Sequence, residues 1–155
     1  RGQLMTTREI LLAIHVMGAV IWIGGGVALN MIGFRLTQTK GELLRPMLKT
    51  FDWVVNRTIL PASLLVLISG ITLVLEGGYS FEDIFVTIGV IGAVLTIIIG
   101  AGILSPRMRK LEAIWEEHGD DSEIASQAVA RLMLIGRLDL VMLFVVIGAM
   151  VFKPI

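Results

Sequence analysis

The sequence predicts an all-α, polytopic membrane protein, built as a four-transmembrane-helix bundle with cytoplasmic helical extensions. Of its 155 residues, 55% are hydrophobic and only 17% are charged, whereas a soluble domain carries about 25% charged residues. The apolar residues fall into four blocks, each close to the roughly 20 residues that cross a ~30 Å hydrocarbon core. This composition argues against a soluble enzyme, a disordered segment and a nucleic-acid binder. The balance of 13 basic and 13 acidic residues also indicates no polyanionic partner.

We place the four spans at about residues 10–34, 58–75, 84–104 and 132–152, within a single domain that covers residues 1–155. Four residues precede Met5, and we expect Met5 to be the native start. The chain contains no cysteine. The sequence therefore excludes disulfides, iron–sulfur clusters, cysteine-ligated zinc and thiol catalysis.

The distribution of Lys and Arg predicts the orientation, because cytoplasmic loops of membrane proteins carry the excess of these residues. The connection between the second and third spans contains none of them. Five lie between the first two spans, and five lie between the third span and the start of the fourth: Arg35, Lys40, Arg45, Lys49 and Arg57, then Arg107, Arg109, Lys110, Arg131 and Arg137. We expect a multi-pass protein of the bacterial inner membrane, with both termini outside.

Both long connections are predicted to be helical. Residues 107–118 form a charged helix that follows Pro106 and ends at Gly119, a favourable residue after a helix C-terminus. Ser122 is a good N-cap for a helix that starts near Glu123 and continues into the fourth span. Residues 43–55 have apolar side chains at helical spacing, which is typical of an amphipathic helix at the membrane interface.

Small residues predict how the spans pack, because helices in lipid associate where small side chains allow close approach. The third span carries such a stripe: Gly89, Ala93, Thr96 and Gly100. One face of the first span holds His15, Ala19, Trp22, Gly26, Asn30 and Gly33.

His15 is the ionisable side chain of the first span, and an ionisable group inside the bilayer is a candidate functional residue. It could be an axial ligand of haem b, a copper ligand or a proton acceptor, or it could be a hydrogen-bonded packing residue. Met150 lies at a similar depth and is the candidate second haem ligand, while Met17 is a candidate copper ligand beside His15. Ligation of haem by two histidines would need a homodimer that brings two copies of His15 together.

Asp139 is the second candidate residue, in the cytoplasmic third of the fourth span. We expect its short side chain to face the bundle and to form an ion pair with Arg57 or Arg107, with a proton relay as the alternative. Glu76, at the outer end of the second span, is expected to approach His15 and orient its ring.

Three segments resemble a family of bacterial integral membrane proteins of unknown function, family 2269. They are H-V-M-G-A-V-I-W-I-G-G-G at 15–26, S-P-R-M-R-K-L at 105–111 and R-L-D-L-V-M-L-F-V-V-I-G-A-M-V-F-K-P at 137–154. The resemblance implies a four-helix membrane fold. The start of the first segment also resembles, more loosely, the copper-resistance protein D group and the small membrane protoporphyrinogen oxidases, which implies a metal or haem role for His15. The oxidases also rely on a membrane lysine, which the spans of this chain lack.

Three functions follow as hypotheses. The first is a haem- or copper-binding membrane protein that uses His15. The second is a small-molecule or ion transporter that works as an oligomer, and the third is a non-catalytic membrane scaffold subunit. Nucleotide-binding, hydrolase and protease motifs are absent from the sequence. The expected partners are the lipid bilayer and a second copy of the chain.

Overall fold

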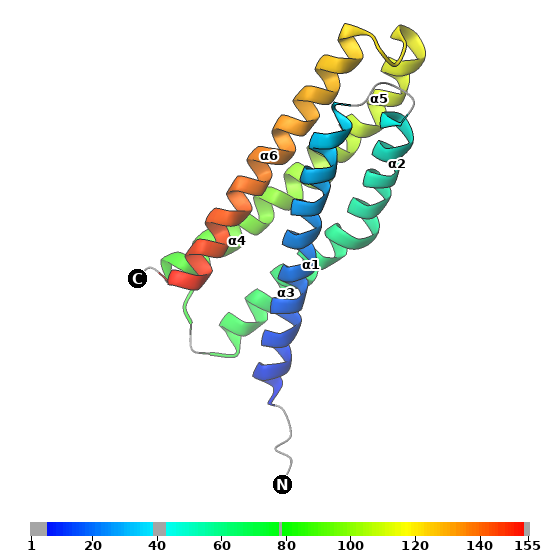
Figure 1. Cartoon of the computed structure of the whole chain (residues 1–155). Coiled ribbons are helices and arrows are strands. Elements are labelled where there is room, and N and C mark those ends of the chain that lie inside the picture. The colour runs from blue at the N-terminus through cyan, green and yellow to red at the C-terminus, as the bar shows by residue number, and fades with distance from the viewer. Residues whose placement is uncertain (1–5, 39–42, 78, 154–155) are drawn as a thin grey trace.

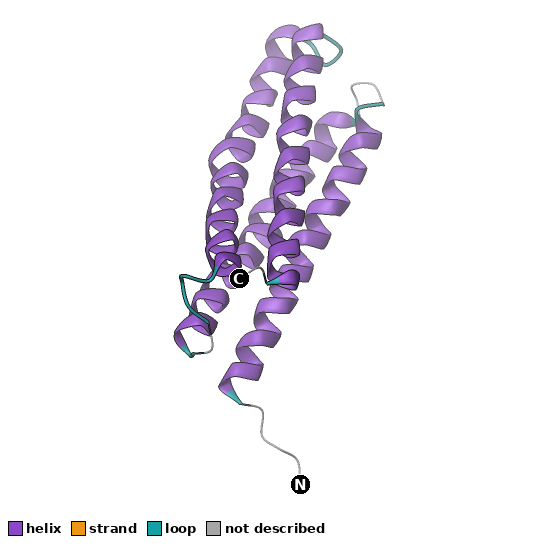
Figure 2. Cartoon of the chain, turned by 90° about the vertical axis from the view of Figure 1, so that its left-hand side faces the viewer, coloured by secondary structure: helices purple, strands orange, loops and turns teal. Residues whose placement is uncertain are grey.

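The computed structural model describes residues 6–38, 43–77 and 79–153, so that Met5 and Lys40 lie outside the described residues. All regular structure in this part of the chain is helical (Figure 2). Four of its helices are long and apolar enough to cross a membrane. The predicted fold class is therefore confirmed.

The four long helices are longer than the predicted spans, because each continues past the apolar block. Two are single α-helices, and the other two are continuous helices that contain a short π-helical segment. In chain order the elements are α1 (Thr7–Leu36), α2 (Leu44–Val54), η1 (Val55–Ile59), α3 (Leu60–Leu75), α4 (Ile84–Ile97), η2 (Ile98–Leu104), α5 (Ser105–His118) and α6 (Glu123–Phe152).

Local signals explain where these helices begin and end. Thr6 and Glu9 form a reciprocal capping box at the start of α1. The Ser122 side chain accepts a hydrogen bond from the Ala125 amide, as expected for the N-cap of α6. Helix α5 ends at Gly119, which has a φ of +83°. Glycine adopts this conformation readily because it has no side chain.

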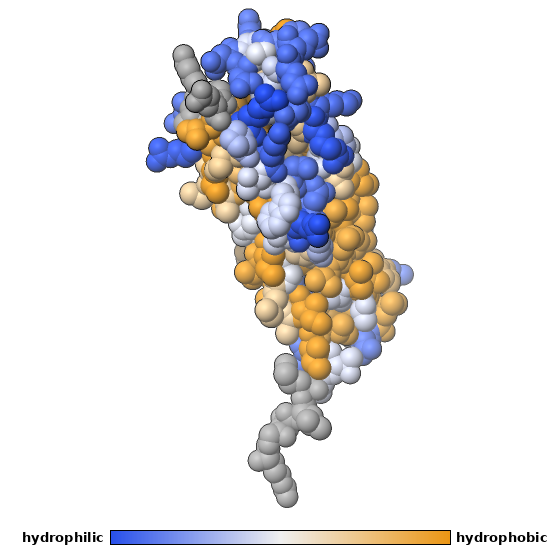
Figure 3. Space-filling view, turned by 90° about the vertical axis from the view of Figure 1, so that its right-hand side faces the viewer, coloured by the Kyte–Doolittle hydropathy of each residue, from blue (hydrophilic) through white to orange (hydrophobic). Residues whose placement is uncertain are grey.

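The helices form a bundle in which α1 packs against α3 and α6, and α4 packs against α3 and α6. The start of α1, the end of α6 and the α3–α4 connection lie at one end of the molecule (Figure 1). At the opposite end, α2 and α5 extend α3 and α4 and pack against each other. Charged side chains gather over this extended end, and the other half of the visible face is mostly apolar (Figure 3).

Each π-helical segment ends two residues before a proline. In η1 the Leu60 amide donates to the Val55 carbonyl, five residues back, and Pro61 follows. In η2 the Ser105 amide donates to the Gly100 carbonyl, and Pro106 follows. Proline has no N–H, and its ring crowds the carbonyl four residues before it. The wider π turn relieves this crowding, so each helix passes its proline without ending.

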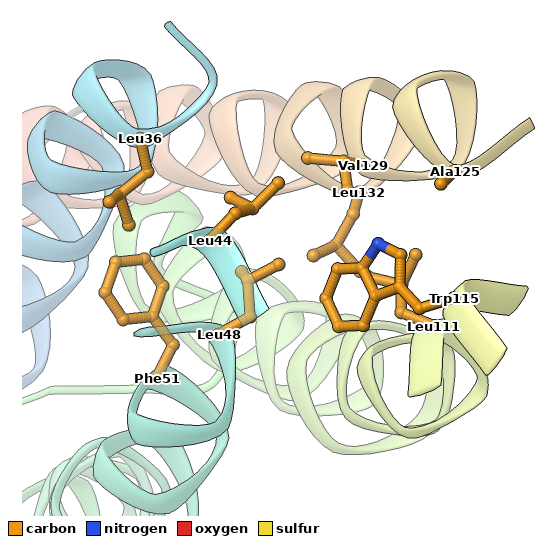
Figure 4. Packing of buried hydrophobic residues seen from close by; sticks show 9 residues of the cluster. All are labelled: Leu36, Leu44, Leu48, Phe51, Leu111, Trp115, Ala125, Val129 and Leu132. Atoms are coloured by element: carbon orange, nitrogen blue, oxygen red, sulfur yellow. The ribbon is translucent and has the colours of Figure 1, made fainter. Parts of the chain in front are cut away.

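Two clusters of buried apolar side chains hold the bundle together. The first lies in the extension and joins α1, α2, α5 and α6 (Figure 4); its members are Leu36, Leu44, Leu48, Phe51, Leu111, Trp115, Ala125, Val129 and Leu132. The second lies further along the bundle and consists of Trp22, Ala62, Val66, Ala93 and Leu143.

The first cluster corrects one prediction. The segment predicted as an interfacial helix, residues 43–55, is not a separate surface helix. Helix α2 continues through η1 into α3, and its Leu44, Leu48 and Phe51 are buried in the first cluster. Its apolar face therefore packs against protein, because α5 and α6 extend beside it and cover that face.

Candidate functional site

A cavity of about 130 Å³ lies between the two apolar clusters. Phe51 and Leu132 of the first cluster bound it on one side, and Trp22 and Leu143 of the second cluster bound it on the other. This volume is close to the ~150 Å³ of an engineered apolar cavity that holds one benzene molecule. The cavity has room for one small solute.

Polar side chains from all four long helices line this cavity. They are Asn30 of α1, Asn56 of η1, Ser63 of α3, Thr96 of α4 and Asp139 of α6. Ser63 and Thr96 each donate their hydroxyl to a backbone carbonyl of their own helix, which leaves the oxygen lone pairs as acceptors. Asn56 is also exposed, so the cavity opens beside η1.

Asp139 differs from the other polar side chains of the cavity because it has no partner. Its Oδ1 atom is fully buried and forms no hydrogen bond. Among the described residues no ion pair joins Asp139 to Arg57 or Arg107, and both arginine side chains are exposed. The predicted structural ion pair is therefore absent. Since a buried charge is costly unless it is paired, this carboxyl group is the strongest candidate for ligand binding in the cavity.

Asn30 joins the helices on either side of Asp139. Its amide nitrogen donates to the Gly26 carbonyl at 3.0 Å and to the Gly136 carbonyl of α6 at 3.5 Å. Both bonds use the NH₂ group, so the amide oxygen remains an acceptor. Gly136 lies one helical turn before Asp139 and also lines the cavity.

The π-helical segments form part of the cavity wall. Val55, Asn56 and Ile59 line it from η1, and Gly100, Ala101 and Leu104 line it from η2. A Cβ atom built on Gly100 meets no atom within 4 Å. Irregular backbone at membrane depth is tolerated where it lines a cavity, and π turns occur frequently at functional sites.

His15 lies outside this cavity, at the contact between α1 and α3. Its Nδ1 is 3.0 Å from the Val66 carbonyl and 3.2 Å from the Ser69 hydroxyl, and its ring lies against Gly70. A carbonyl can only accept, so Nδ1 carries the proton and donates it. Nε2 then has its lone pair free, and no described residue binds it. The Val66 carbonyl binds Nδ1, and among the described residues no hydrogen bond joins the ring to Glu76, the residue that we expected to orient it.

The structure does not bring the predicted metal ligands together. Met17 is 65% exposed, and lies on α1 about 200° around the helix from His15. The methyl group of Met150 packs on Gly89 of α4, whereas the imidazole packs on α3. In the part of the chain that the structure describes, no group of three or more His, Cys, Asp or Glu side chains could hold a metal ion.

A groove between α2 and α5 adjoins the cavity. Its lining consists of Leu48, Lys49, Asp52, Met108, Arg109, Glu112 and Trp115. Met108 lines both the groove and the cavity.

A polar cluster lies where the groove meets the cavity. Ser105 donates to Asp52 Oδ1 at 2.7 Å, and the Asn56 amide donates to the same oxygen at 3.0 Å. Arg109 reaches Ser105 Oγ at 3.0 Å. The hydroxyl of Ser105, which is 2% exposed, therefore lies between Arg109 and Asp52.

The sequence pointed to Asp139 and placed Asn30 on the same face of the first span as His15, but Asn56, Ser63 and the groove were missed. The available signal was the pair of prolines within long helices, since each marks a turn whose backbone departs from the α-helix.

Comparisons with known proteins agree with the fold. Searches of curated proteins and of solved structures found no match. A family model described as predicted integral membrane protein (DUF2269) matches residues 9–154. With nearly the whole chain matched and four helices able to cross a membrane, the chain belongs to the DUF2269 family of integral membrane proteins.

Proposed function

We propose that this membrane protein binds a small polar solute in the cavity around Asp139, as the binding step of transport. The observation that carries the proposal is the buried Oδ1 atom of Asp139, which has no hydrogen-bond partner among the described residues and lies in a cavity large enough for a solute. A buried polar group without a partner costs about 1–3 kcal/mol. A side chain needed only for packing would not retain this cost.

The backbone around the cavity supports the same function. Pro61 and Pro106 each leave a carbonyl of the preceding turn without its usual donor. Transporters in membranes commonly bind substrates where helices are interrupted, since the freed backbone groups become ligands. Here both helices are continuous, but each departs from α-helical geometry in a π-helical segment, η1 or η2, that lines the cavity containing Asp139.

Flux through proteoliposomes tests this proposal. The full chain is reconstituted, and entry of methylammonium, guanidinium, urea and glycerol is measured against protein-free vesicles. We expect at least one of these probes to enter faster with the wild-type protein. The Gly100→Leu variant should lose this flux, because its side chain fills the cavity.

Gly148→Leu is the matched control. Gly148 also has open space around an added Cβ but does not line the cavity, so its flux should equal that of the wild type. The proposal is wrong if no probe enters faster than into empty vesicles, or if Gly100→Leu transports as well as Gly148→Leu.

His15 supports a second candidate function, the binding of haem b or copper. The Nδ1 bond to the Val66 carbonyl orients the ring and leaves Nε2 free, which is the usual arrangement of a ligating histidine. The loose resemblance to the copper-resistance protein D group points to the same residue. Because the ring packs closely on Gly70, the group would bind at the surface of the bundle, with the remaining ligands from a second copy in a homodimer.

Metal analysis and an absorption spectrum test this candidate on protein expressed with ample haem or copper. We expect bound haem or copper in the wild type, and its loss in His15→Gln. His118→Gln is the control, since His118 is the other histidine of the chain and lies at the end of α5. Colourless, metal-free wild-type protein under both conditions would rule this function out.

A further inference from the structure

The charge of the cavity indicates which class of solute it holds. Of the residues that line it, only Asp139 is ionisable. The other polar groups present oxygen acceptors, among them the amide oxygen of Asn30 and the hydroxyl oxygens of Ser63 and Thr96. A site with one acid, several acceptors and no basic side chain favours a cation that donates hydrogen bonds.

The size of the cavity and its aromatic lining indicate which kind of cation it favours. A volume of about 130 Å³ exceeds what a bare metal ion fills. Trp22 and Phe51 both line the cavity, and aromatic rings attract organic cations through their π faces. These features favour a compact ammonium or guanidinium ion over a bare metal ion.

A second acid, Asp52, lies in the groove beside the cavity, and among the described residues it has no direct ion pair, although Lys49 and Arg109 also line the groove and Arg109 donates to the Ser105 hydroxyl that binds Asp52. At this end of the molecule Arg45 contacts Glu112, Glu116 and Asp120 at 2.6–3.8 Å, and Lys49 contacts Glu112 at 3.0 Å. Asp52 is different, because among the described residues it accepts hydrogen bonds only from the neutral groups of Ser105 and Asn56. It lines the α2–α5 groove, while its partner Asn56 lines the cavity.

We infer that the solute is a small organic monovalent cation, of ammonium or guanidinium type, that enters through the α2–α5 groove. Asp52 is its first binding position, and Asp139 is its final one. The Asp52–Ser105–Asn56 cluster joins the two positions, because Asp52 contacts the groove and Asn56 contacts the cavity. This inference rests on the proposed function and adds the class of solute and its route of entry.

Guanidinium and urea provide the test, because they are planar, alike in shape and different in charge. Binding of each, at millimolar concentration, is measured by calorimetry on the purified full chain. We expect guanidinium to bind about tenfold more tightly than urea, since a hydrogen bond between two charged groups is stronger than one that a neutral donor makes. In Asp139→Asn the two affinities should become equal.

The route is tested by the rate of guanidinium binding, followed through tryptophan fluorescence because Trp22 lines the cavity. Asp52→Asn should slow association severalfold, because a charge along the route attracts the cation. Glu82→Gln is the control, because it removes the same charge. Glu82 is exposed and lies in the connection at the other end of the molecule. This variant should therefore bind guanidinium as fast as the wild type does.

The outcomes separate the inference from the proposed function. Equal binding of urea and guanidinium by the wild type, with flux still lost in Gly100→Leu, would retain the cavity and overturn the cationic solute. No change in Asp52→Asn, or an equal slowing in Glu82→Gln, would overturn the route. Failure of every probe to enter vesicles or to bind would overturn the proposed function itself.

Discussion

The carboxyl group of Asp139 lines the cavity, and in the described part of the chain neither a cation nor a hydrogen-bond donor contacts it. The ion pair predicted from the sequence would have made this residue a structural element of the bundle. If the ion pair existed, replacing Asp139 would leave a buried cation without its partner and destabilise the fold. Because the pair is not formed, replacing Asp139 leaves no such cation, and we expect the opposite effect on stability.

We therefore predict that Asp139→Leu raises the stability of the protein. The substitution keeps a similar volume and removes an unsatisfied buried oxygen, so unfolding should become harder by about 1–3 kcal/mol. Thermal unfolding of the purified protein in detergent measures this change. A lower midpoint in both Asp139→Leu and Asp139→Asn would indicate a stabilising partner and contradict the unpaired carboxyl group.

Tyr79 is the single tyrosine of the chain and lies beside the end of α6. Lys153 donates a hydrogen bond from Nζ to its hydroxyl oxygen at 2.8 Å. This bond, and the positive charges of Lys153 and Arg8, lower the pKa of Tyr79 from its ordinary value of 10.0. The contact holds the α3–α4 connection against the C-terminal end of α6.

We predict that the tyrosinate absorbance of the folded protein titrates below pH 10.0, and that Lys153→Met moves the midpoint upward. Folding lowers the pKa of Tyr79, so the ionised side chain favours the folded state. Its contribution to the free energy of unfolding is present above the pKa of the unfolded chain, and it is lost as the pH falls through the pKa of the folded protein. Lys49→Met, at the opposite end, should leave the titration unchanged. An identical midpoint in the wild type and Lys153→Met would show that the contact does not form in solution.

At the scale of the elements, the contact between α4 and α6 depends on glycines of α4. A different side chain of α6 lies against each of these glycines. The predicted stripe included Gly89 and Gly100 but not Gly92. In the structure, a Cβ on Gly92 would overlap Cγ2 of Val146, and one on Gly89 would overlap the terminal methyl of Met150. Gly100 is not part of this contact, because it lines the cavity.

We predict that Gly92→Ala destabilises the protein more than Gly89→Ala does. Valine is branched at Cβ and cannot move its methyl group away, so the overlap at Gly92 should cost about 1–3 kcal/mol. The Met150 side chain is flexible and can repack beside the added methyl group at a lower cost. Gly148→Ala is the control, because its Cβ has open space and Ala favours the helix by about 1 kcal/mol. Equal thermal midpoints for the three variants would contradict this packing.

At the scale of the whole molecule, α2, which carries Arg45 and Lys49, and α5, which carries Arg107, Arg109 and Lys110, lie at the same end. The α1–α2 and α5–α6 connections are at this end, and the α3–α4 connection is at the other (Figure 1). The uneven distribution of Lys and Arg among the connections is therefore an uneven distribution between the two ends of the bundle. This is the pattern that the positive-inside rule describes.

We predict that a membrane-impermeant maleimide added from outside labels Glu82→Cys and not His118→Cys in intact cells. The chain has no native cysteine, so each variant carries one reactive thiol. Labelling of His118→Cys in cells permeabilised beforehand is the control for reactivity. The opposite labelling pattern would place the termini in the cytoplasm.

Most of the fold could be predicted from local patterns. The four apolar blocks, the Ser122 cap and the stop at Gly119 depend on residues close together in the chain, and all of them were correct. The continuity of α2 with α3 was missed, because it depends on how a π turn accommodates Pro61. Whether α2 lies on a membrane or against protein likewise depends on α5 and α6, which are distant in sequence.

By itself, the sequence determined the number of spans, the helical class and the presence of one acid and one histidine at membrane depth. These follow from hydropathy and from the high cost of burying charge, which act on each segment separately. Only the tertiary structure decided what those two residues do. It placed the imidazole against a carbonyl of α3, and it left the carboxyl group of Asp139 without a partner in a cavity formed by four helices. Both outcomes depend on the rotation and spacing of neighbouring helices, which the packing of the whole bundle sets.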